Sequence, residues 1–115
     1  MVRDPLSMTF AALADPTRRA ILARLSVGEA SVAELAEPFD MTMRAVSSHI
    51  AVLEAAGLVS RGRDAQRRPS RIRLDPLADI DGWLEDYRKL WTRRFDKLDK
   101  HLANRSKHDD GDHGG

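Results

Sequence analysis

The chain has 115 residues, 42% of them hydrophobic, with no cysteine and a formal net charge of +1. A chain of this length folds as one domain with a modest core, and the lack of cysteine excludes disulfides, thiolate metal sites and thiol redox switches. No apolar run approaches the roughly 20 residues of a membrane span, and the N-terminus lacks a signal-peptide pattern, so we expect a cytoplasmic protein without membrane contact.

Two helices are predicted in the first 30 residues. The first follows a frayed start at 1–5, and its apolar positions at helical spacing are Leu6, Phe10 and Leu13. The second, at about 16–26, begins with the N-cap Asp15 and with Pro16, whose missing N–H costs nothing in a first turn. Its expected core positions are Ile21, Leu22 and Leu25. Its basic residues, expected in solvent or near phosphate at best, are Arg18, Arg19 and Arg24.

A helix-turn-helix is predicted next. Ser31 and Glu34 form the capping-box pattern of a short helix, which Pro38 ends. After the short link 39–41, a helix at 43–56 is capped by Thr42 and ended by Gly57. One side of this helix is apolar, with Val46, Ile50 and Leu53. The other side carries small and polar residues suited to a DNA groove, namely Arg44, Ser47, Ser48 and Ala51.

An arginine-rich hairpin, the wing, is predicted after Gly57. Residues 58–63 pair with 71–74 across a turn at about 64–68, with Ile72 and Leu74 on the inner face. Charges on an edge strand can simply block edge pairing, but the number of arginines exceeds that need. We therefore expect contacts with phosphates or the minor groove from Arg71 and from the tip residues Arg63, Gln66, Arg67 and Arg68. Arg61 and Arg73 are expected to lie farther back.

The longest predicted element is a helix at about 76–105, capped by Asp75. At about 1.5 Å per residue it is roughly 45 Å long, and its apolar face is too long for the preceding region to cover. A second copy is expected to cover it, through an interface of Leu6, Phe10, Leu77, Ile80, Trp83, Leu84, Tyr87, Trp91, Phe95 and Leu98. An alternative interpretation is that the aromatic residues line a ligand pocket. Residues 1–105 would form one DNA-binding and dimerisation domain, and 106–115 a disordered polar tail.

The sequence resembles the ArsR family of bacterial winged helix-turn-helix repressors over nearly all of its length except the tail. The resemblance rests on LADPTRR at 13–19, ELAEP at 34–38, AVSSHI at 45–50 and LEAAGLV at 53–59, followed by the basic wing. The aromatic last helix is similar to the branch often encoded beside SRPBCC-like proteins. The resemblance implies a mainly α fold with a small β-hairpin wing, which dimerises through its N- and C-terminal helices.

Three positions depart from the family pattern. Metal-sensing members carry cysteines in the first helix of the helix-turn-helix, where this chain has VAELA at 32–36. Ser48 replaces a usual lysine or arginine, and Ala65 stands near a usual glycine of the wing turn. Family members can bind zinc through Asp-x-His pairs in the last helix, and the candidates are Asp99, His101, His108 and His113. A second pair is missing, so neither a metal nor another cofactor is expected.

The sequence thus predicts a homodimeric, sequence-specific transcriptional regulator, a repressor of an inverted-repeat operator in double-stranded DNA. The predicted DNA contacts are Thr42, Arg44, Ser47, Ser48, His49, Arg63, Gln66, Arg67, Arg68 and Arg71. For His49, contact with phosphate and packing in the core stay equally open. No phosphate loop, nucleophile elbow or carboxylate pair indicates an enzyme. Two alternatives are a metal- or ligand-responsive sensor of this fold, with an unidentified small-molecule effector, and a winged-helix module that binds an acidic protein.

Overall fold

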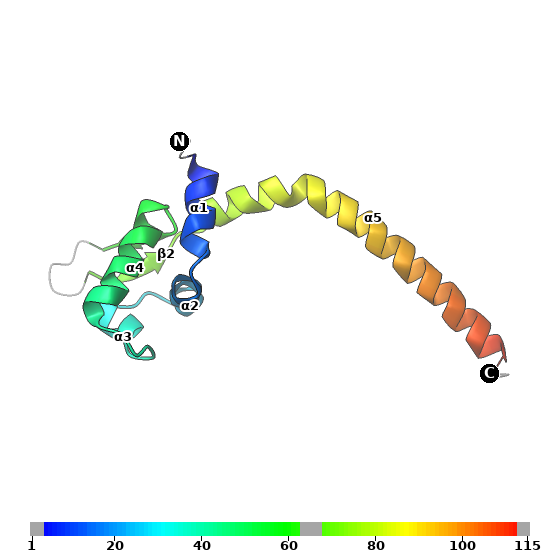
Figure 1. Cartoon of the computed structure of the whole chain (residues 1–115), viewed down its shortest axis with the longest axis horizontal. Helices are drawn as coiled ribbons and strands as arrows, with labels where there is room; N and C mark the ends of the chain where they lie inside the picture. Colours follow the sequence, from blue (N-terminus) through cyan, green and yellow to red (C-terminus); the bar gives the residue numbers. More distant parts are fainter. Residues whose placement is uncertain (1–3, 63–67, 113–115) are drawn as a thin grey trace. The chain divides into compact units, whose positions relative to one another are not determined.

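The structure, a computed structural model, describes residues 4–62 and 68–112, with side chains up to residue 102. The chain divides into two compact units, 1–80 and 81–115. The elements follow one another as α1 (Pro5–Leu13), α2 (Pro16–Leu25), α3 (Val32–Ala36), α4 (Met43–Ala55), β1 (Val59–Arg61), β2 (Ser70–Ile72) and α5 (Asp75–Asp112) (Figure 1). The predicted fold class, mainly α with a two-stranded wing, is confirmed.

Side-chain caps begin the four short helices of the first unit. As the sequence predicts, the first-turn N–H groups of α2 are bonded by Asp15 and those of α4 by Thr42. At the start of α3, Ser31 and Glu34 cap each other's backbone N–H groups. Asp4 does the same for α1, where its carboxylate accepts a hydrogen bond from the Ser7 N–H at 2.7 Å. The prediction of a frayed start was therefore wrong for residues 4 and 5, because it overlooked a second Asp-Pro start signal.

Helix α4 ends in a Schellman motif, which sets the direction of the chain into the wing. Gly57 has a φ of +78°, in the left-handed region that glycine enters without a steric cost. The Gly57 N–H donates to the Glu54 carbonyl and the Leu58 N–H donates to the Leu53 carbonyl, each at 2.9 Å. Leu58, which follows directly, is fully buried and connects the end of α4 to the core.

The core of the first unit lies between α2, α3, α4 and the base of the wing. Its buried side chains include every position predicted for the inner faces of α2 and α4, together with Leu35 of α3. These residues are Ile21, Leu22, Leu25, Leu35, Val46, Ile50 and Leu53. Burial of this kind stabilises each helix mainly through its apolar face. The outer face of α4 is consequently left for another role.

The wing hairpin is shorter than predicted and is held at its base by a third segment. β1 and β2 pair antiparallel, with Val59 opposite Ile72. Ala30, in the link between α2 and α3, forms a bridge with Ser70 through two backbone hydrogen bonds of 3.1 and 2.8 Å. Ile72 packs against the core as predicted. The prediction for Leu74 was wrong, because β2 ends at Ile72 and Leu74 is 63% exposed.

The second unit consists of the part of α5 from Asp81 onward. Arg88 forms ion pairs with Asp81, about two turns earlier on the helix, and at 3.2 Å with Glu85, about one turn earlier. The helix extends to Asp112, past the predicted end at Arg105. Disorder of 106–115 stays a prediction. In the part of the chain that the structure describes, no helix is long and apolar enough to cross a bilayer.

Candidate nucleic-acid interface

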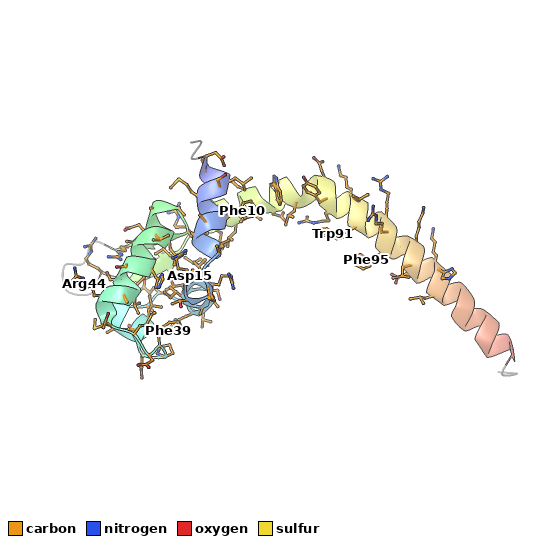
Figure 2. All side chains as sticks on the ribbon, viewed as in Figure 1. Phe10, Asp15, Phe39, Arg44, Trp91 and Phe95 are labelled. Carbon is orange, nitrogen blue, oxygen red and sulfur yellow. The ribbon has the colours of Figure 1, made fainter. Side chains whose placement is uncertain are left out.

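The outer face of α4 presents the side chains that the sequence assigns to a DNA groove. Thr42, Arg44 and Ser48 are exposed, whereas Ser47 and His49 are half-buried. Arg44 projects from α4 into solvent (Figure 2). Val46 and Ile50, on the opposite side of the helix, are fully buried and fix its rotation about its own axis. The face that remains carries one cation and small hydroxyl groups, so a duplex could approach it closely.

The hydroxyl groups of this face have different hydrogen-bonding roles. Thr42 Oγ1 accepts a hydrogen bond from the Ala45 N–H at 3.0 Å, so its hydroxyl hydrogen is left to donate. Ser48 Oγ donates to the Arg44 carbonyl at 3.1 Å, so toward a ligand it offers an acceptor. Thr42 thus suits a phosphate oxygen and Ser48 suits a donor on a base edge, while the exposed Arg44 suits either.

His49 contacts α2 through the side chain of Arg18. Its Nδ1 lies 3.2 Å from Nη1 of Arg18. A guanidinium group can only donate, so Nδ1 must be the acceptor and the ring proton must lie on Nε2. Arg18 thus reaches the His49 ring from a position 31 residues away in the chain. Contact of His49 with phosphate stays a prediction.

Arg18 and Arg19 cap the end of α1. The expectation of a solvated side chain was wrong for Arg18, whereas Arg19 is exposed as expected. Arg18 donates from Nε to the Ala12 carbonyl at 2.7 Å and from Nη2 to the Ala11 carbonyl at 3.1 Å, and its side chain is only 16% exposed. Arg19 donates to the Leu13 carbonyl at 2.6 Å. The last carbonyls of a helix have no partner within it and attract cations. Arg18 therefore connects the end of α1 to α4.

Asp15 completes this cluster at the start of α2. Burial raises the pKa of its carboxyl, but hydrogen bonds from the Arg18 and Thr17 N–H groups, with the positive charge of Arg18, outweigh this, and the pKa lies below the ordinary value. The carboxylate lies 4.0 Å from Arg18 Nη1. Asp15 therefore stays ionised near neutral pH and can balance a positive charge on either neighbour.

Arg61 joins the wing to α4 and is directed inward. Its Nη2 donates to the Ser47 carbonyl at 3.2 Å, and its Nε lies 3.9 Å from a Glu54 oxygen. The side chain is 15% exposed, and Nε is buried without a hydrogen bond among the described residues. The sequence placed Arg61 behind the DNA-contacting tip, but nothing in the local pattern indicated this tie to the recognition helix.

The other wing arginines differ in their surroundings. Arg71, a predicted DNA contact, is exposed and forms an ion pair with Glu29. Arg73 forms an ion pair with Asp75 at 3.2 Å. Arg68 is exposed, with a φ of +36°. The remaining predicted contacts lie outside the described residues: Arg63, Gln66 and Arg67.

The predicted interface residues of α5 form an exposed apolar stripe in the second unit. Trp83 and Tyr87, one turn apart, pack with their rings tilted by 49° and their centroids 5.1 Å apart. Farther along the helix, Trp91 and Phe95 project from the same side (Figure 2). Its exposed members are Trp83, Tyr87, Trp91, Phe95 and Leu98, and Leu84 is half-buried. Aromatic side chains exposed at this density mark a binding surface.

The predicted interface residues of the first unit are less exposed. Phe10 of α1 is 39% exposed, and Leu6 is half-buried. Leu77 and Ile80 are also half-buried, and Leu77 packs against the core of its own chain. Part of the apolar face of α5 thus belongs to the first unit's own packing. Among the described residues no three metal-ligating side chains come together, and the side chains of His108 and His113 lie outside them.

Comparison with known proteins identifies the class of protein. Residues 13–61, which span α2 to β1, match the model of a helix-turn-helix domain. The HTH-type transcriptional regulator Rv2034 of Mycobacterium tuberculosis is 42% identical over 82 residues, which are 71% of this chain and 74% of that protein. The transcriptional repressor SdpR of Bacillus subtilis is 29% identical over 71% of this chain and 91% of its own length.

Solved structures then give the family. The crystal structure of the ArsR family transcriptional regulator RHA00566 is similar with a TM-score of 0.72 and 42% identity, over 77% of this chain and 98% of that one. A homodimeric winged helix-turn-helix domain from Mycobacterium bovis, a possible ArsR-family regulator, gives 0.60 and 27% identity over 75% and 80%. The chain belongs to the ArsR family: it is a DNA-binding transcriptional regulator with a winged helix-turn-helix fold, in a family of regulators and not of enzymes.

Proposed function

We propose that this regulator is a homodimeric repressor that binds an inverted-repeat operator. Each α4 enters a major groove, and each wing holds the flanking backbone. The twofold symmetry of the dimer requires half-sites about 10 bp apart or a multiple of that distance. A repressor of this kind would act by occupying its operator, as the name of the similar SdpR states for that protein.

The observation that carries the proposal is the outer face of α4. Arg44 and Ser48 are exposed on a helix whose opposite side is locked into the core through Val46 and Ile50. The Thr42 cap lies at the N-terminus of this helix, where the helix dipole favours a phosphate. Bidentate recognition of guanine by Arg44 would supply direct sequence readout.

The exposed aromatic stripe supports the homodimer. Trp91 is 42% exposed and Phe95 is 60% exposed in the isolated chain. Aromatic residues are enriched at protein interfaces, and a twofold axis would let this stripe cover itself. The solved relative described as homodimeric has the same winged fold, which agrees with this arrangement.

The test uses the full-length protein without a presumed operator. Fragments bound from random and genomic DNA are sequenced, and sedimentation equilibrium gives the oligomeric state at micromolar concentration. We expect an inverted repeat, a dimer, and an affinity that falls steeply as salt rises, because phosphate contacts release counterions. A monomer at these concentrations, or DNA binding that does not respond to salt, would contradict the proposal. Selective retention of an acidic protein with no bound DNA would favour the protein-interaction alternative.

A further inference from the structure

The proposed DNA-binding role of the outer face of α4 does not explain the contact between Arg18 and His49. Arg18 is bonded at once to two carbonyls of α1 and to the ring of a residue on α4. Its side chain is 16% exposed, which is little for a guanidinium group outside a core. A surface arginine that only adds solubility would not need three intramolecular partners, so this one has a positioning role.

His49 lies between the exposed residues of α4 that are proposed to read the DNA sequence and the core. Ser48 precedes it on the exposed face, and Ile50 follows it in the core. The His49 side chain therefore lies beside the exposed face of α4 and connects it to α2 through Arg18. Hydrogen-bonded contacts of this kind hold a helix to one of several packings that the apolar residues alone would tolerate.

We propose that Arg18 and His49 form a positioning pair, which holds α4 in its DNA-reading position only while His49 is neutral. Neutral His49 accepts the Arg18 hydrogen bond at Nδ1. A second ring proton removes that acceptor and places two cations 3.2 Å apart. Operator binding should therefore weaken as pH falls. The inference rests on the proposed DNA-binding role of α4.

The charged groups around His49 favour a change of partner on protonation. On α2, Arg18 faces His49 directly, and Asp15 is close enough for its carboxylate to feel the charge of the His49 ring. On β1, Arg61 is directed to the Ser47 carbonyl and Glu54. On α3, Glu34 is bonded within its own capping box. α1 carries no charged side chain. A protonated His49 would thus leave Arg18 and turn toward Asp15.

The direction of the pH effect separates this proposal from phosphate contact. If His49 bound a phosphate, its protonation would add a cation to the DNA-binding surface and strengthen binding at low pH. If it positions α4 through Arg18, protonation weakens binding. The net value of one such hydrogen bond corresponds to a loss of affinity of about 3- to 10-fold.

The experiment compares the wild type with His49→Asn in the full-length protein. The asparagine carbonyl can occupy the place of Nδ1 and accept from Arg18, but it does not titrate. Affinity for a selected operator is measured by fluorescence anisotropy at constant ionic strength between pH 7.5 and 5.5. Both proteins keep His101 and the tail histidines, so their effects cancel in the comparison.

We expect wild type to lose about 3- to 10-fold in affinity between pH 7.5 and 5.5, and His49→Asn to show no such loss relative to its own affinity at pH 7.5. His49→Gln, whose amide reaches the place of Nε2 instead, is the matched control and should bind weakly at both pH values. Parallel profiles for wild type and His49→Asn, or a relative gain by wild type at low pH, would overturn the proposal. Circular dichroism melting shows whether each variant is folded.

A second readout needs neither DNA nor a variant. Nitrogen-15 NMR of the wild-type imidazole at pH 7.5 should show His49 with its proton on Nε2, whereas the opposite tautomer would refute the Arg18 contact. If no DNA fragment is bound but this tautomer is found, the proposed repressor function fails while the pair stands. If DNA is bound and the opposite tautomer is found, the pair fails alone.

Discussion

Replacing Arg61 with methionine tests whether the wing and the recognition helix are held together as described. Methionine keeps most of the apolar stem and removes the three nitrogens. Two contacts are lost, the hydrogen bond to the Ser47 carbonyl at 3.2 Å and the ion pair with Glu54 at 3.9 Å. We therefore expect Arg61→Met to lower the free energy of unfolding without removing a contact to phosphate.

The expected decrease in the free energy of unfolding follows from these two contacts. A hydrogen bond from a charged donor is worth about 1.5 to 3 kcal/mol, and the lower value applies here because the bond is long. The pair with Glu54 adds at most about 0.5 kcal/mol, since that carboxylate is 44% exposed. Removing the buried, unbonded Nε returns about 1 kcal/mol of desolvation. The net destabilisation is about 1 kcal/mol.

Urea unfolding at one fixed protomer concentration measures this change, because the stability of a dimer depends on concentration. The matched control is Arg71→Met on the paired strand. Arg71 is 67% exposed and its partner Glu29 is 48% exposed, so we expect a loss below about 0.5 kcal/mol. The two variants should rank the other way in the salt dependence of DNA binding. Arg71→Met should reduce the slope of the logarithm of the binding constant against the logarithm of the salt concentration by about 0.9, and Arg61→Met should leave this slope unchanged. An Arg61→Met protein with unchanged stability and a smaller slope would refute the reasoning.

Three further predictions concern the reading face, the dimer and the cap of α2. Arg44→Ala should cost about 1 to 3 kcal/mol of discrimination between the selected operator and single-base variants; a uniform loss on all sequences would assign Arg44 to phosphate. Trp91→Glu should weaken the dimer by about 2 kcal/mol in sedimentation equilibrium, and an unchanged dissociation constant would place the interface elsewhere. Asp15→Ala should lower the Tm at pH 7. Because the pKa of Asp15 is lowered in the folded protein, its stabilising effect is present above the ordinary aspartate range and is lost below about pH 4. The Tm difference between the two proteins should therefore shrink there, and a constant difference would contradict the assignment.

Much of the fold could be predicted because its signals are local. Thr42 caps a helix within its own turn, and Val46, Ile50 and Leu53 follow the helical period, so both could be identified from spacing alone. Gly57 is similar, since a left-handed residue after a helix favours glycine. The face left over after these assignments was the predicted reading face, and the structure exposes Arg44 and Ser48 there.

The roles of the arginines could not be predicted in the same way. Arg18 and Arg61 use their long side chains to reach carbonyls and a ring on other elements, and those partners are brought close only by the tertiary fold. In the sequence such residues look like solvated or DNA-contacting cations. Ser70 was missed for a related reason: it is fully buried because Ala30 pairs with it from a distant link.

The pairing of Ala30 with Ser70 has a consequence for how the wing opens. The base of the hairpin joins three segments that are distant in sequence, at residues 30, 59–61 and 70–72. Their backbone amides should therefore resist hydrogen exchange together with those of the helical core, as one cooperative unit. The base of the wing then acts as a rigid platform, which opens only together with the helical core.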